Sequence, residues 1–179
     1  AYVEFTVPRL EYWDLLVLDK RTDIKVDGWP GDWTGAAPAA LHDVTIDQGE
    51  WIYRGDAGDH RTFTGASADE DITEVRFTCD ETYLYGLVRM QDIADTSLPA
   101  LGIAWNSHVP GSTMPWLGDA STPASSIGLE NAAQAATRQI MIYTAGGSPR
   151  IRLYNGGVWY VPNALDSAAS VSPDHDCIE

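Results

Sequence analysis

Acidic side chains gather in one glycine-rich stretch of this sequence, between residues 55 and 71. Four aspartates, Asp56, Asp59, Asp69 and Asp71, lie there among three glycines. Calcium takes about six to eight oxygen ligands in flexible geometry, and carboxylates on a backbone that glycine lets curl can supply them. We therefore expect these aspartates to hold a calcium ion. The spacing does not match an EF-hand loop, and a solvated loop in which Asp and Gly only make turns is the alternative.

Tryptophan and tyrosine dominate the aromatic residues, with seven Trp and eight Tyr against three Phe. A Trp ring at a loop or strand end can stack on the apolar face of a sugar. Because exposed aromatic clusters tend to mark binding, we expect ligand contacts at Trp105, Trp116, Trp159 and Tyr160. Trp33 follows a Gly-Asp pair in a turn and fits better as a core anchor that holds its loop onto the fold.

Motifs for catalysis are missing from the chain. It contains no phosphate-binding glycine loop, no dinucleotide fingerprint and no Gly-x-Ser-x-Gly elbow. The four histidines lack paired zinc spacing, so a transition-metal site has no support. Paired carboxylates for glycoside hydrolysis need no motif, yet the acids cluster in loops with Gly, which suits cation binding better than a buried acid with a raised pKa. We expect no enzyme activity.

Charge and length limit the possible partners. The 179 residues are 44% hydrophobic, enough for one domain with a sizeable core. Asp and Glu outnumber Lys and Arg by 26 to 11, which gives a net charge of −15 and disfavours nucleic acid and anionic membranes. No apolar run approaches the ~20 residues of a membrane span, and the first residues lack a secretion signal, so we expect an exported chain whose signal has been removed.

Short alternating segments punctuated by Gly, Pro, Asp and Asn predict an all-β fold. In 72–79, Val75, Phe77 and Cys79 share one face of a half-buried antiparallel strand that forms a hairpin with 83–90. Asn155-Gly156-Gly157 predicts a second tight hairpin. About ten short strands favour a two-sheet antiparallel β-sandwich, jelly-roll-like, over an α/β fold. The expected strands are 2–7, 12–18, 23–26, 50–54, 72–79, 83–90, 101–105, 138–143, 150–154 and 158–161.

Two local questions stay open at the level of sequence. Residues 131–137 contain four alanines and could form a helical turn or two, or lead directly into the next strand. Cys79 and Cys177 could form one long-range disulfide in an exported protein, or be two small buried hydrophobes.

Several segments in order resemble the carbohydrate-binding module family 9 and the C-terminal domain of glucodextranase, sandwich modules of secreted α-glucan-degrading enzymes. The resemblance covers about residues 22–179. It implies an extracellular, non-catalytic sandwich with structural calcium, in which Asp56, Asp59 and Asp71 fall where such modules place loop acids. The segments are IKVDG at 24–28, GDWTG at 31–35, GEWIYRGDAGDHRT at 49–62, DITEVRFT at 71–78, YLYGLVRM at 83–90 and WLGD at 116–119.

Three positions depart from the pattern of that family. Phe63 stands where another acid is expected, and Ala104-Trp105-Asn106 replaces an acidic pair after a strand. Residues 175–179 resemble only the opening of the final strand of the module. The N-terminal segment 3–8 alternates, ends in a proline and resembles such a final strand. We therefore expect 22–179 to be a sandwich whose last strand is incomplete, and 1–21 to be a strand segment, either a donor that can complete a sandwich or a strand of a preceding domain.

An incomplete sandwich leaves unpaired backbone groups beside an open core. Downstream residues, the N-terminal strand of the chain itself, or that of a neighbouring copy could fill the gap, and the last option repeated head to tail builds a filament. We expect a calcium-containing accessory module that binds an α-glucan or related polysaccharide at the cell surface or outside the cell. The alternative is a structural subunit of an extracellular filament assembled by strand donation.

Overall fold

The structure is a computed structural model that describes residues 23–59, 71–94, 101–105, 116–117, 127–128, 138–145, 148–155, 158–160 and 167–179. These ranges are mostly strand and contain no helix of seven or more residues, which confirms the all-β prediction. Their helical turns are η1 (Pro30–Asp32) and η5 (Pro173–His175). Within the same ranges, no helix is both long and apolar enough to cross a membrane.

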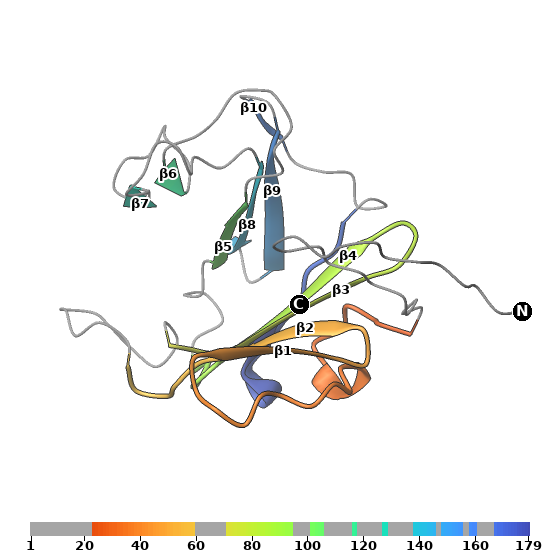
Figure 1. Cartoon of the computed structure of the whole chain (residues 1–179). Helices are drawn as coiled ribbons and strands as arrows, with labels where there is room; N and C mark the ends of the chain where they lie inside the picture. The colour runs from red at the N-terminus through yellow and green to blue at the C-terminus, as the bar shows by residue number, and fades with distance from the viewer. Residues whose placement is uncertain are drawn as a thin grey trace, which may run out of the picture.

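Six strands form one antiparallel sheet, drawn across the lower half of Figure 1. Their order is β1-β2-β3-β4-β12-β11. The last two strands of the chain therefore join the first four where β12 pairs with β4. The hairpin predicted between β3 and β4 is confirmed by the register Phe77↔Gly86. The strands are β1 (Asp43–Asp47), β2 (Glu50–Arg54), β3 (Ile72–Cys79), β4 (Leu84–Met90), β11 (Val171–Ser172) and β12 (Cys177–Ile178).

A second antiparallel sheet lies above the first in Figure 1 and has the order β10-β9-β8-β5. The Asn155-Gly156-Gly157 hairpin prediction is confirmed, because β9 and β10 are antiparallel with Asn155 opposite Val158. A separate two-stranded ribbon joins β6 to β7. The strands are β5 (Leu101–Trp105), β6 (Trp116–Leu117), β7 (Ile127–Gly128), β8 (Arg138–Ala145), β9 (Ser148–Asn155) and β10 (Val158–Tyr160).

Strand β4 is covered on both of its faces, which explains its nearly continuous apolar sequence. On one face Val88 and Met90 pack with Ile178 of β12 and with Leu101 and Ile142 of the four-stranded sheet. A second cluster, on the opposite face, contains Leu87 and Cys177 together with Ile24 and Trp33 from the segment before β1. The main core therefore lies between the two sheets, and β4 and β12 are at its centre.

Two local expectations differ from the structure. Residues 23–26, predicted as a strand, form no strand. Ile24 is buried in the second cluster, and the amide of Lys25 donates to the carboxylate of Asp32 instead of to the backbone of a neighbouring strand. Strand β1 was not predicted. It joins β2 through a two-residue turn in which Gln48 and Gly49 both have positive φ, 51° and 76°, as a type I′ hairpin requires.

The polar face of β3 is more deeply buried than its apolar face. Arg76 is 8% exposed, and its guanidinium donates to the carboxylate of Glu50 and to Glu74, both at 2.7 Å. Glu50, fully buried, also accepts from the backbone amides of Thr34 and Gly35. Burial lowers the pKa of Arg76, but its bonds to the two glutamates outweigh burial and leave that pKa raised.

Candidate functional site

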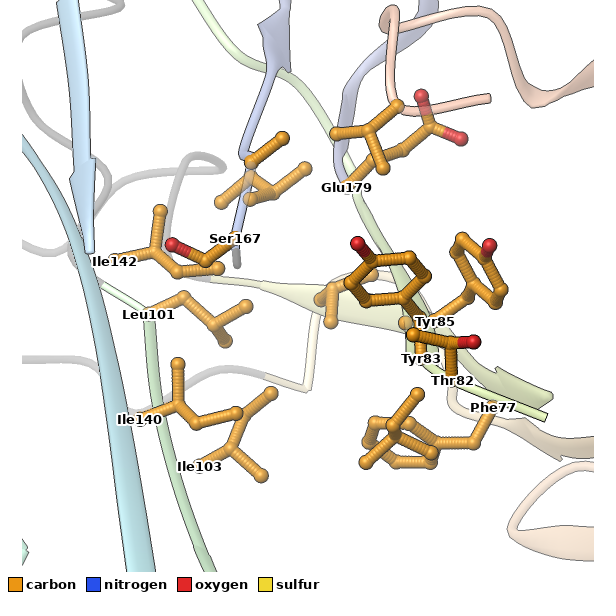
Figure 2. A pocket seen from close by; sticks show the side chains of 16 residues that line it. Phe77, Thr82, Tyr83, Tyr85, Leu101, Ile103, Ile140, Ile142, Ser167 and Glu179 are labelled. Carbon is orange, nitrogen blue, oxygen red and sulfur yellow. The ribbon is translucent and has the colours of Figure 1, made fainter. Parts of the chain in front are cut away.

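An apolar groove of about 510 Å³ opens between the two sheets along β4. Figure 2 shows Ile103, Ile140 and Ile142 on the side of the four-stranded sheet, and Phe77 with Tyr83 and Tyr85 across from them. Tyr83 and Leu84 are 43% and 61% exposed, so large apolar side chains stand at the mouth of the groove. Its lining also includes Val26, Thr82, Gly86, Val88, Leu101, Ser167, Ala168, Ile178 and Glu179.

The edge of β4 beside the groove is only partly paired. Strand β12 covers it at Arg89 and Val88, and no described residue pairs with the part from Leu84 to Leu87 on that side. The amide of Met90 donates to Asp176, so Met90 directs its backbone groups to the β12 side. Because that direction alternates along a strand, Gly86 and Leu84 direct their N–H and C=O groups to the same side. These groups can accept a further strand.

Glu179 forms the wall of the groove at the end next to β12. Its carboxylate is buried and accepts from the amides of Gly28 and Asp27 and from the indole of Trp33, at 2.6, 3.2 and 2.9 Å. Burial raises the pKa of this carboxyl, and the three hydrogen bonds offset only part of the rise. The bonds fix the loop that carries Val26, another groove residue, against β12.

The two cysteines are free thiols, so the alternative of a disulfide is not realised in the structure. Cys79 pairs with Leu84 at one end of β4, whereas Cys177 pairs with Arg89 near the other end. Five residues of strand separate these positions by roughly 16 Å, beyond the reach of a disulfide. Burial raises the pKa of Cys177 to about 11, which makes it a poor nucleophile.

The acidic stretch is described at both of its ends. Asp71 is buried, and its carboxylate accepts a short hydrogen bond from the amide of Gly58, so the bend at 55–59 is tied to the start of β3. Asp59 is exposed and lies 3.9 Å from the ring of His42, and Asp56 is half-buried. Asp69 lies outside the described residues. Among the residues that the structure describes, no three His, Cys, Asp or Glu side chains form a metal-binding group.

The structure gives the backbone positions of the four residues that are predicted to contact carbohydrate. Trp105 ends β5 and Trp159 lies in β10, at opposite edges of a four-stranded sheet, which separates them by roughly 14 Å of strand spacing. Trp116 lies in the β6–β7 ribbon. Trp159 and Tyr160 are consecutive in one strand, and successive strand positions belong to opposite faces. The structure therefore does not gather these four positions on one surface.

Sequence reasoning missed the residues that form the groove. Gly86 interrupts an otherwise large-residue strand, and glycine inside a strand often marks the close approach of another group. That feature could have indicated the site. Comparison with family models, with curated proteins and with solved structures gave no match for this chain. The functional argument therefore depends on the groove and on the β4 edge.

Proposed function

We propose that this chain is a non-catalytic, extracellular structural subunit that assembles with neighbouring copies by β-strand donation. In this proposal the two sheets are the layers of a jelly-roll-like sandwich, and the groove takes a strand from the next copy. The observation that carries the proposal is the coincidence of an apolar groove with an edge of β4 that no described strand pairs with at Leu84 and Gly86. Adding a strand to such an edge satisfies backbone groups and fills the core together.

The donor that fits is the segment 3–8 of another copy. Val3, Phe5 and Val7 alternate with polar residues, so one face of an extended segment is apolar, and Pro8 closes it. Residues 9 to 22, 14 in all, connect it to Asp23 and span up to about 50 Å when extended, enough to reach a neighbouring subunit. In this proposal each copy donates to the next copy and accepts from the previous one, so the contact is heterologous, and repeated without closure it builds an open filament.

A charged substitution at the mouth of the groove tests this proposal. Leu84→Asp puts a carboxylate where the donor strand must bury apolar side chains. The free-energy cost of burying that charge disfavours docking. Ile46→Asp is the matched control, because Ile46 is equally exposed, 61%, but lies on β1 at the far edge of the sheet. We expect filaments in negative-stain micrographs of the unchanged chain and of Ile46→Asp, and monomers for Leu84→Asp. Equal assembly of all three chains would refute the proposal.

Calcium bound by Asp56, Asp59, Asp69 and Asp71 is part of the proposal as a structural ion. Its support is the hydrogen bond from Gly58 to the buried Asp71, which draws the two ends of the acidic stretch together. An ion bound only by the folded chain must raise its stability. A chelator should therefore lower the melting temperature, and calcium added in excess should restore it. If the chelator leaves the melting temperature unchanged, calcium is no longer part of the proposal.

Polysaccharide binding is a second candidate, favoured by one observation. The register of β9 and β10 places Trp159 directly opposite Tyr154, and opposed residues share a face, so two aromatic residues belong to one surface of the four-stranded sheet. This proposal predicts retardation of the chain in a native gel that contains starch, and loss of retardation on Trp159→Ala. Unchanged migration across several common polysaccharides would exclude it.

A further inference from the structure

Gly86 ends a row of residues that crosses four strands of the larger sheet. Ile46 is opposite Trp51, Trp51 is opposite Phe77, and Phe77 is opposite Gly86, so all four positions share the face that turns toward the groove. The rings of Trp51 and Phe77 are in contact, with centroids 5.8 Å apart. The next position in this row lies beyond the edge of β4, where none of the described strands pairs with Gly86.

The missing side chain of Gly86 makes room at that position. A Cβ on Gly86 would lie 3.1 Å from the ring of Phe77, tighter than an ordinary contact, so the ring lies directly against the glycine backbone. Figure 2 shows Ile103 and Ile140 across the groove from Phe77. A side chain placed beside Gly86 would therefore meet an aromatic ring on one side and aliphatic side chains on the other.

We infer that this place beside Gly86 is a specificity pocket for Phe5 of the neighbouring copy; the inference rests on the proposed strand donation. A donor that runs on in the direction of β12 is antiparallel to β4. Ile178 already stands opposite Val88, so the next two positions on the core face are opposite Gly86 and then Leu84.

The donor sequence selects one register for those two positions. With Phe5 opposite Gly86, Val7 stands opposite Leu84, and Pro8 falls opposite Tyr83, beyond the end of β4, where no ladder N–H is needed. Shifting the donor by two residues would put Val3 beside the glycine and leave Val7 beyond the strand. An aromatic side chain over a strand glycine and beside another ring is the favourable pairing. Phe5 is therefore the residue that fills the pocket.

Two full-length chains isolate a single docking event. The donor chain carries Leu84→Asp and cannot accept; the acceptor chain carries Val3→Asp, Phe5→Asp and Val7→Asp and cannot donate. Sedimentation velocity of the mixture measures the dissociation constant of the one heterodimer. We expect Phe5→Ala in the donor chain to weaken binding roughly 100-fold, and Val3→Ala, which lies outside the pocket, to weaken it by a clearly smaller factor.

A larger side chain at Gly86 of the acceptor gives a second test of the pocket. Gly86→Val in the acceptor fills the pocket, so it should weaken the Phe5 donor strongly and the Phe5→Ala donor by less than about threefold. If the heterodimer forms but Val3→Ala weakens it more than Phe5→Ala, the pocket assignment is overturned while strand donation stands. If the two chains do not associate at all, the proposed function itself has failed, and with it this inference.

Discussion

Replacing Arg76 should be among the most damaging single changes to this fold. Glu50 is completely buried, and Arg76 supplies its positive partner at 2.7 Å. Arg76→Met keeps a long apolar stem but removes the positive charge that Arg76 gives to the buried carboxylate, and breaking a buried pair in this way costs about 3 to 5 kcal/mol. The amides of Thr34 and Gly35 still donate to Glu50, so we expect the lower half of that range.

Urea unfolding, followed by tryptophan fluorescence, measures this cost. The background is the Leu84→Asp chain, so that assembly does not add to stability. Arg54→Met is the matched control, because the Arg54 side chain is partly exposed and, among the described residues, donates to the carbonyls of Pro38 and Ala39; its loss should cost less than about 1.5 kcal/mol. If Arg76→Met destabilises the chain no more than Arg54→Met, the buried pair does not hold this part of the sheet together.

Three further predictions concern the groove wall, the thiols and the acidic stretch. Burial raises the pKa of Glu179 above its ordinary value of 4.5, so its contribution to stability is full below pH 4.5 and is lost as the pH rises through the raised pKa. Glu179→Gln does not titrate at this position, so its unfolding free energy should rise relative to that of the unchanged chain as the pH increases above 4.5; a difference that stays constant with pH would contradict the raised pKa of Glu179. A thiol reagent should modify half-buried Cys79 in the folded chain and the buried Cys177 only after unfolding, and equal rates by mass spectrometry would show that β12 is not docked. Asp71→Ala removes the acceptor of the Gly58 amide and should lower the unfolding free energy by about 1 to 3 kcal/mol, whereas Asp56→Ala, half-buried in the same bend, should cost less in the same urea titration.

Local patterns were enough to predict some of the strands that pair with their neighbours in sequence. The β3–β4 and β9–β10 hairpins follow from alternation and turn residues, which act over a few positions. Strand β1 carried the same information in its alternating Val44 and Ile46, but those side chains are exposed, and the Gln-Gly turn is a weaker indicator than Asn-Gly.

Long-range partners were beyond sequence reasoning. In a half-buried strand the residues that alternate with Val75 and Phe77 are expected to face solvent, yet Arg76 and Thr78 are buried. Glu50 and the carbonyl of Gly35, which are 26 and 41 residues away from Arg76, satisfy its guanidinium, and the hydroxyl of Thr78 donates to the carbonyl of Gly49. The groove depends likewise on β12 meeting β4 across the chain, a contact that no local pattern contains. Residues 1–22, 60–70 and 131–137 lie outside the described structure, so the expectations for them remain predictions.

The most direct measurement is amide hydrogen exchange at Leu84 and Gly86. The acceptor chain with three N-terminal aspartates should exchange both amides rapidly when alone, because the β4 edge is then uncovered. Adding the Leu84→Asp donor chain should slow the exchange of the acceptor amides at least about 100-fold, while amides of the β1 edge stay unchanged. Amides that are already protected in the acceptor alone, or that stay fast after the donor is added, would contradict strand donation at this edge.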